Sequence, residues 1–127
     1  MLNITSENIG EIMVVRCAGR LLHGAGCEEL TRAVKAGEGP RIVLLDLSDV
    51  ELVDAGGLSA LITGHHWTRK RGIQLKLVNP SGLVYDILLR TKLDEVLNIS
   101  SLGEALQILR SQMICEAQPA ARQAVSA

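Results

Sequence analysis

Aromatic residues are almost absent from this 127-residue chain: they make up 2% of it, and phenylalanine does not occur. The hydrophobic fraction of 47% must therefore come mostly from aliphatic side chains, which predicts a core of leucine, isoleucine and valine. A shortage of aromatic rings argues against a surface that stacks nucleic-acid bases. With 13 basic and 14 acidic residues, the chain has no excess positive charge to neutralise phosphates, so nucleic acid is not an expected partner.

Cysteine is scarce as well, with three residues and no pair at the C-x-x-C spacing. An odd count predicts neither a disulfide framework nor a zinc site, and reduced thiols indicate a cytoplasmic location. No apolar run approaches the roughly 18 residues that span a bilayer, and the first residues do not resemble a signal peptide. Direct membrane insertion is therefore not expected.

The chain alternates between strand-like and helix-like patterns. Strands are expected at 2–5, 12–18, 42–47, 73–78 and 96–99, and helices at 27–36, 58–71, 79–90 and 102–113. The run at 42–47 is almost continuously apolar, as is typical of a parallel strand that is covered on both faces. This order predicts one α/β domain over 1–115, a mostly parallel sheet of four to five strands with a short edge strand first, flanked by about four helices. Residues 116–127 are expected to form a loose tail.

Helix ends and apolar stripes add local detail. Asn79 is the candidate N-cap of the third helix, with Pro80 in its first turn, and Ser101 with Glu104 has the spacing of a capping box. The stripes expected to face the core are Leu58, Leu61, Ile62 and His65 in the second helix, and Leu102, Ala105, Leu106, Leu109 and Met113 in the last one.

An acid and two glycines, Asp54-Ala55-Gly56-Gly57, stand between an apolar segment and a predicted helix. In mostly parallel sheets the functional surface lies at such carboxyl ends of strands. The corner fits a tight turn in which Asp54 accepts hydrogen bonds from the first helical amides and glycine lets the backbone turn; if Gly57 needs a positive φ, Gly57→Val should damage this turn. It also fits an anion site at a helix N-terminus, although no phosphate-loop pattern accompanies it. The third interpretation is an exposed helix start on which another protein docks.

Five segments carry a family resemblance in the same order along the chain. One of them, residues 44–58, reads D-L-S-D-V at 46–50 and D-A-G-G-L at 54–58; the others are 18–21, 77–81, 89–96 and 101–106. Together they resemble STAS domains, the anti-sigma factor antagonists, whose signature is D-L-S-x-V followed by D-S-S-G-L or D-S-A-G-L. Lys92 stands where the family has a glycine. The resemblance covers about residues 2–115 and implies a sheet of four or five strands with helices.

The resemblance also implies how the corner works. In antagonists of this family, an anti-sigma factor that is also a serine kinase binds around the D-S-S-G-L helix and phosphorylates its second serine. Here Ala55 falls on the first serine, Gly56 on the phosphorylated one and Gly57 on the glycine. Gly56 has no hydroxyl, so the resemblance implies a docking surface without its usual switch. Gly56→Ser is then expected to restore an acceptor.

Hydroxyls do follow on the helix, at Ser59 and Thr63. Ser59 is a candidate substitute for the missing phosphoacceptor, but ordinary polar residues on a solvated helix face are the simpler interpretation. Trp67 is either an exposed interface anchor or a residue packed against the neighbouring helix. The residues expected to bind a partner are Asp54, Ala55, Gly56, Gly57, Ser59, Thr63, His66, Trp67 and Lys70.

The implied activity is binding and not catalysis. No nucleophile elbow accompanies the serines and histidines, and the adjacent His65 and His66 point in different directions on a helix, so neither an enzyme, a metal nor a cofactor is expected. The leading partner is an anti-sigma factor of the serine-kinase type. The alternatives are a role as STAS subunit of an ABC-type lipid transporter, or as scaffold of a signalling assembly. The oligomeric state stays open, a homodimer included.

Overall fold

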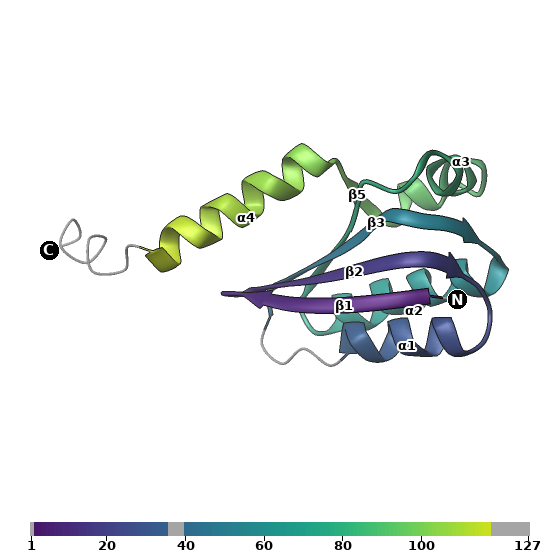
Figure 1. The fold of residues 1–127 in the computed structure, drawn as a ribbon, viewed down its shortest axis with the longest axis horizontal. Helices are drawn as coiled ribbons and strands as arrows, with labels where there is room; N and C mark the ends of the chain where they lie inside the picture. Colours follow the sequence, from purple (N-terminus) through teal and green to yellow (C-terminus); the bar gives the residue numbers. More distant parts are fainter. Residues whose placement is uncertain (1, 36–39, 118–127) are drawn as a thin grey trace, which may run out of the picture.

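A five-stranded sheet forms the centre of the molecule (Figure 1). The computed structural model describes residues 2–35 and 40–117, with side chains up to residue 111. The elements are β1 (Leu2–Ile9), β2 (Ile12–Leu21), α1 (Ala25–Lys35), β3 (Ile42–Val53), α2 (Ala55–Lys70), β4 (Gln74–Val78), α3 (Gly82–Arg90), a 3-10 helix η1 (Leu93–Glu95), β5 (Asn98–Ser100) and α4 (Leu102–Ala117). The strand order is β1-β2-β3-β4-β5, antiparallel between β1 and β2 and parallel elsewhere. The predicted fold class is confirmed.

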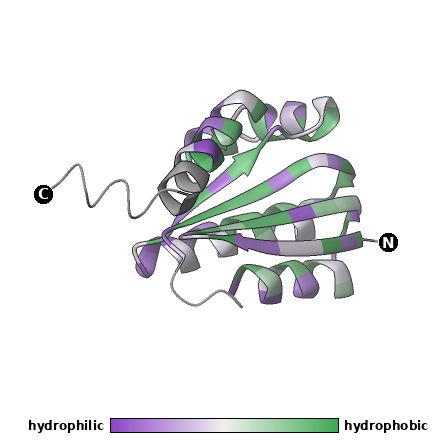
Figure 2. Cartoon of the chain, turned by 60° about the vertical axis from the view of Figure 1, so that its left-hand side comes forward, coloured by the Kyte–Doolittle hydropathy of each residue, from purple (hydrophilic) through white to green (hydrophobic). Residues whose placement is uncertain are grey.

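Helices lie on both sides of the sheet, and α1 and α2 run side by side beneath it in Figure 1. One group of buried residues joins the strands to α1, α2 and α3, with Leu30, Leu61 and Leu88 from the helices. A smaller group on the other side joins Ile12, Val14, Leu44 and Val78 of the strands to Ala105 of α4. The inner strands are accordingly mostly hydrophobic in Figure 2. The core is aliphatic, as the composition predicted.

Several element boundaries differ from the sequence prediction, among them the ends of β1, β2 and β3 and the starts of α2, α3 and β5. β1 continues to Ile9 instead of ending at residue 5, because the hairpin turn is made by Gly10, whose φ of 60° suits glycine. β3 continues to Val53, well beyond the predicted end at residue 47. The predicted helix end at residue 36 and most of the predicted tail, 118–127, lie outside the described residues, and α4 reaches Ala117. Of the helices in the described part of the chain, none combines the length and apolarity that a bilayer span requires.

The predicted cap of α3 is wrong. Asn79 has φ 47° and lies before the helix, whereas Ser81 takes the N-cap position. The hydroxyl of Ser81 donates 2.7 Å to the carbonyl of Val50 and so ties the start of α3 to β3 instead of capping its own helix. Sequence spacing could not reveal this bond, because Val50 is distant in the chain.

The capping box of α4 is confirmed, but its apolar stripe is only partly right. The Glu104 amide donates 3.1 Å to the Ser101 hydroxyl, and the Ser101 amide donates 3.4 Å to the Glu104 carboxylate. Ala105 is buried, whereas Leu102 and Leu106 are exposed at 49% and 55%. The reason is that α4 meets the sheet along Ala105, Ile108 and Leu109, which turns the other side of the helix outward. The side chain of Met113 lies outside the described residues.

A left-handed residue follows α3. Lys92 has φ 60° and ψ 20° in the segment between α3 and η1, the position where the resembled family carries glycine. Left-handed backbone brings the Cβ atom of a lysine close to the following carbonyl group, which costs roughly 1–2 kcal/mol.

We expect Lys92→Gly to raise the free energy of unfolding by roughly 0.5–1 kcal/mol, because the relief of the left-handed strain exceeds the extra chain entropy of glycine. Urea unfolding followed by circular dichroism measures it. Arg90→Gly is the matched control, since residue 90 is helical, and it should lower stability by about 1 kcal/mol. A loss of stability with Lys92→Gly would contradict the strain at residue 92.

Candidate functional site

Asp54 lies between the last residue of β3 and the first residue of α2. Its backbone is extended, with φ −106° and ψ −174°, and its side chain accepts a 2.8 Å hydrogen bond from the Gly57 amide. This is an N-cap, which satisfies a backbone donor that the first helical turn leaves free. The helix therefore starts at Ala55 and includes both glycines, whereas the sequence predicted a start at residue 58.

Asp54 also holds the loop that follows β2. Both of its carboxylate oxygens accept a hydrogen bond from the backbone amide of His23, at 3.1 Å each. β2 and β3 are parallel neighbours whose last paired residues are Leu21 and Val53, so their loops emerge side by side. The amides of His23 and Gly57 hold the pKa of the Asp54 carboxyl below its usual value. One ionised side chain thus joins two loops that are far apart in sequence.

Gly57 is needed for close packing and not for a turn. It lies within α2 and is not among the glycines with positive φ, so the condition on which the turn argument for Gly57→Val depended is not met. A Cβ atom at residue 57 would overlap the carbonyl oxygen of Leu21 and would lie 2.5 Å from Cγ2 of Val53. The backbone of α2 can approach the ends of β2 and β3 this closely only because residue 57 has no side chain.

Gly56 faces the same constraint from a different neighbour. A Cβ atom at residue 56 would lie 2.6 Å from Cβ and 2.8 Å from Cα of His23. Real contacts of a Cβ atom are longer than this, and part of the obstacle is backbone. The expectation that Gly56→Ser simply restores an acceptor is therefore corrected: a side chain at residue 56 has no room unless the β2–α1 loop moves.

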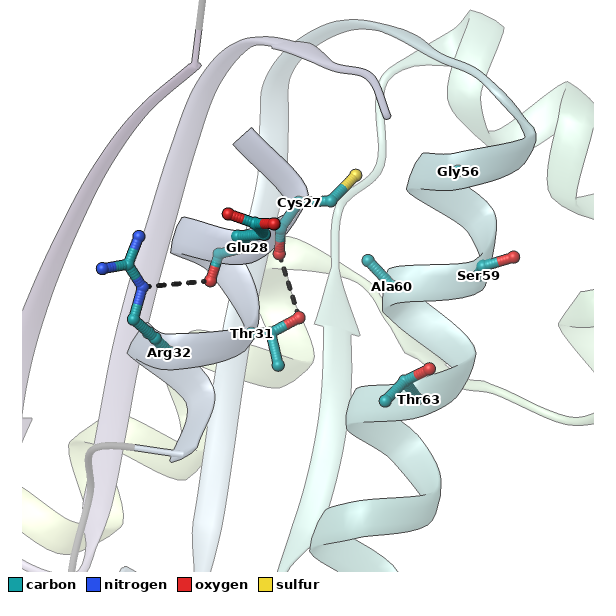
Figure 3. A pocket seen from close by; sticks show the side chains of 8 residues that line it. All are labelled: Cys27, Glu28, Thr31, Arg32, Gly56, Ser59, Ala60 and Thr63. Carbon is teal, nitrogen blue, oxygen red and sulfur yellow. Dashed lines mark hydrogen bonds between the residues drawn. The ribbon is translucent and has the colours of Figure 1, made fainter. Parts of the chain in front are cut away.

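A groove runs between α1 and α2 next to this corner (Figure 3). Its volume is about 480 Å³, and it is lined by Cys27, Glu28, Thr31 and Arg32 of α1 and by Gly56, Ser59, Ala60 and Thr63 of α2. Most of these side chains are small, which keeps the space between the helices open. In Figure 3, Cys27 and Ala60 point into the groove, whereas the hydroxyl of Ser59 points away from α1. The groove continues the surface of the corner along two helices.

The structure distributes the remaining predicted partner-binding residues along α2. Ala55, Ser59, Thr63, His66 and Lys70 are all exposed, as a docking surface requires. Of these, Ser59 and Thr63 line the groove with Gly56, and His66 and Lys70 do not. Which of them contact a partner stays a prediction.

The sequence left two interpretations of Trp67, an exposed interface anchor or a residue packed against the neighbouring helix. In the structure Trp67 is half-buried. The guanidinium of Arg71 lies 4.1 Å from the centre of its ring, and the Lys35 ammonium of α1 lies 6.0 Å from it. Arg71 directly follows α2, so only the Lys35 contact reaches from α1 to Trp67. Trp67 thus lies beside the end of α1 and keeps part of its side chain accessible.

The core-facing stripe of α2 differs from the prediction. Its buried residues are Gly57, Leu61, Gly64 and Thr68, while Leu58, Ile62 and His65 are half-buried. Of the two glycines, only Gly57 lies too close to its neighbours for a Cβ atom, whereas a Cβ atom at Gly64 would make an ordinary 3.6 Å contact with Leu75. Thr68 satisfies its hydroxyl by donating 2.9 Å to the Gly64 carbonyl. Burial lowers the pKa of His65, and the neighbouring charges of His66 and Arg69 add to the effect.

Sequence reasoning missed the contribution of the β2–α1 loop and of α1. His23, Cys27 and Thr31 complete the corner and the groove, yet none belongs to the D-A-G-G-L segment. A signal did exist: parallel strands end at one edge of a sheet, so the residues after β2 had to lie near those after β3. Among the described residues, no three His, Cys, Asp or Glu side chains gather as a metal site.

The STAS domain family model matches residues 3–105. The chain belongs to the STAS domain family. An anti-sigma factor antagonist from Mycobacterium paratuberculosis has a similar structure, with a TM-score of 0.71 and 22% identity over 87% of this chain and 95% of that one. A sulfate transporter family protein from Wolinella succinogenes is similar with a TM-score of 0.69 and 23% identity, covering 80% of this chain and 87% of that one. At these identities both comparisons show the fold alone.

A closer sequence relative is a transporter. The Arabidopsis thaliana protein named "Probable sulfate transporter 3.4" is 34% identical over 104 residues. The match covers 79% of this chain but only 16% of the relative, so the chain corresponds to a small part of that protein.

We expect the stabilisation by Asp54 to depend on pH. Its pKa is lowered in the folded state, so the ionised carboxylate stabilises the fold fully above the unfolded value of 3.8, and this contribution is lost as pH falls through the folded value. Asp54→Asn should therefore lower the free energy of unfolding more at pH 6 than at pH 3. Urea unfolding of the wild-type protein and of Asp54→Asn at each pH measures the difference between their free energies of unfolding. The other titrating groups are the same in both proteins and therefore do not contribute to this difference. An equal difference at both pH values would contradict the role of the charge.

We expect Gly56→Ser to lower the free energy of unfolding by about 1–3 kcal/mol, as overpacking does. In the His23→Gly background the same substitution should be less destabilising by about 1 kcal/mol, because the obstructing Cβ atom is gone. Gly82→Ser is the matched control: it also lies in the first turn of a helix, but a Cβ atom there meets nothing within 4 Å. If Gly56→Ser lowers the free energy of unfolding equally in the wild-type and the His23→Gly protein, His23 does not obstruct residue 56.

Proposed function

We propose that this chain is a protein-binding STAS domain that docks an anti-sigma factor of the serine-kinase type. The docking surface comprises the first turn of α2, the β2–α1 loop and the α1–α2 groove, and is called the α1–α2 surface below. The action is binding and not catalysis, and it takes place in the cytoplasm.

The observation that carries this proposal is the corner at Asp54. A carboxylate with three hydrogen bonds holds the two loops in one arrangement, so a partner meets a surface that is already formed. Exposed residues of α2 extend this surface, and the small side chains between α1 and α2 leave a groove in it. The family's antagonists bind their kinase around the equivalent helix, which supports the same use here.

The proposed binding is constitutive. A phosphate would add nearly two negative charges to the middle of such a surface and break the complex. Residue 56 has neither a hydroxyl nor space for one, because His23 lies against it. Release then depends on the abundance of the chain, or on a hydroxyl elsewhere such as that of Ser59.

The second candidate is a STAS domain that belongs to a transport system. The 34% identity to part of a plant sulfate transporter favours it, and the missing acceptor at residue 56 agrees with a role without a phosphorylation switch. The ABC-type lipid transporter subunit and the signalling scaffold remain further alternatives. Fold alone does not choose among them.

Affinity capture from the native lysate, followed by mass spectrometry, separates the two candidates. We expect the wild-type protein to recover a serine kinase of the anti-sigma type, and Ser59→Arg to lose it, because the exposed residue 59 lies on the α1–α2 surface. Gln107→Arg, an exposed change on α4, is the control and should retain the partner. Addition of ATP should not release the kinase.

Other outcomes would decide against the leading candidate. Recovery of a permease or a transport ATPase that Ser59→Arg abolishes would favour the transporter candidate and keep the α1–α2 surface. Recovery of any partner equally by both variants would show that binding uses a different surface. Release by ATP, with phosphate mapped to Ser59 or Thr63, would show that the switch has moved along the helix.

A further inference from the structure

Basic side chains gather at the end of the molecule where α1 and α2 stop. Both helices follow a strand and run back along the sheet side by side, so they end at the edge where β3 and β4 begin (Figure 1). Five exposed cations lie at this edge and are called the basic end below. They are Lys35 at the end of α1, Arg41 just before β3, Arg69 and Lys70 in the last turn of α2, and Arg71 directly after it.

Contacts between these segments place the cations close together. The Arg71 guanidinium lies 4.1 Å from the centre of the Trp67 ring and the Lys35 ammonium lies 6.0 Å from it, so cations from two segments share one ring. Arg41 and Gly72, the residue after Arg71, line the same small pocket. The basic end is therefore one surface built from three segments of the chain.

The charge of the basic end is largely uncompensated. Among the described residues, its one ion pair joins Arg41 to Glu11, at 3.6 Å. Glu38 lies outside the described residues but between Lys35 and Arg41 in the sequence. Five cations against these two acids leave a net charge of +3. The partial charge of roughly −0.5 at the C-terminus of each helix favours cations at this place but does not neutralise them.

The opposite end of the molecule carries more acids than bases. At the edge where β2 and β3 end, Arg20 stands against Glu28, Glu29, Asp49, Glu51 and Asp54. The net charge of −1 is therefore distributed unevenly, positive at one end of the strands and negative at the other. An anionic surface attracts the first end and repels the second, so it would bind this molecule in a single orientation.

A partner recognised by charge alone fits the basic end better than a folded protein does. Protein interfaces have an apolar centre, whereas the exposed large apolar side chains that the structure describes belong to the last residues of β3, to α3, to the residue after η1 and to the start of α4. Nucleic acid is disfavoured because the chain has neither excess positive charge nor many aromatic rings. Trp67, half-buried beside these cations, is a residue type that membrane–water interfaces favour.

We propose that the basic end binds the phosphate headgroups of an anionic lipid membrane. The contact is electrostatic and peripheral, because clustered lysines and arginines are attracted to anionic lipids without entering the hydrocarbon layer. The acidic end, and with it the α1–α2 surface, then faces away from the membrane. The contact uses none of the residues that line the α1–α2 groove, so the inference does not rest on the proposed function.

Co-sedimentation of the purified full chain with lipid vesicles tests this inference. Emission of Trp67, the single tryptophan of the chain, is a second measure because the residue lies at the contact. We expect binding to vesicles of phosphatidylglycerol and phosphatidylcholine in equal parts, with a change in Trp67 emission. Binding should be lost as the salt concentration rises from about 0.1 M to 1 M, because the Debye length falls from about 10 Å to 3 Å.

Other anions separate a lipid surface from alternative partners. Phosphatidylcholine vesicles and inorganic phosphate should leave Trp67 emission unchanged, and polyglutamate and duplex DNA should bind more weakly than the anionic vesicles. No binding to the anionic vesicles at low salt, or equal binding to phosphatidylcholine, would overturn the proposal. Polyglutamate or DNA bound as tightly as the anionic vesicles would show that the basic end takes a different polyanion, which also overturns it.

Charge substitutions locate the contact. Lys70→Gln should weaken binding to the anionic vesicles by about fivefold and Lys70→Glu by about tenfold or more. Lys92→Glu is the matched control, because it makes the same change of charge at an exposed lysine between α3 and η1, and it should keep the affinity. Circular dichroism checks that the variants are folded. Equal losses with Lys70→Glu and Lys92→Glu would show that binding follows total charge and not the basic end.

Discussion

The hydrogen bonds of the Asp54 carboxylate hold together the edge of the sheet at which β2 and β3 end. They reach the amide of His23 after β2 and the amide of Gly57 in the first turn of α2. Because β2 and β3 are parallel and adjacent, both loops emerge at the same edge of the sheet, but nothing in the strands themselves would fix the loops relative to each other. A carboxylate suits this place because it accepts several bonds at once and because the N-terminus of a helix favours negative charge.

Close approach of the backbone is the second requirement of this arrangement. Gly56 lies against His23, and Gly57 against Leu21 and Val53, at distances that exclude a Cβ atom. The small residues along α2 and α1 continue this pattern away from the corner, where they leave the groove open instead of filling it. Glycines therefore allow the close contact at the start of α2, and small side chains beside them leave the groove open.

A phosphorylation switch needs an acceptor and space around it, and residue 56 offers neither. The corner nevertheless has an acid as N-cap and a glycine at the close approach of α2 to β2 and β3. A rigid surface without a switch suits a component that stays bound, whether to a regulator or within a transport system. The fold is similar both to an anti-sigma factor antagonist and to a sulfate transporter family protein, so the fold alone does not choose between the two candidate functions.

Several features of this protein followed from the sequence alone. The alternation of apolar runs and helical patterns specified the α/β fold with a mostly parallel sheet, and the D-A-G-G-L segment located the corner. The capping box at Ser101 and Glu104 was also readable, because both of its partners lie within one helical turn. These features depend on short-range geometry or on hydrophobic periodicity, which one chain segment carries by itself.

Other features were decided only by the tertiary structure. The hydrogen bonds from the His23 amide to Asp54 and from the Ser81 hydroxyl to the Val50 carbonyl join residues that are distant in the chain. Leu102 and Leu106 of α4 are exposed, although the helical spacing predicted that both face the core. The spacing of a helix shows which residues share a face, but only the packed neighbours decide which face is buried and how closely the backbones approach. For the same reason, the lack of space at Gly56 became visible only when the loop after β2 was placed against it.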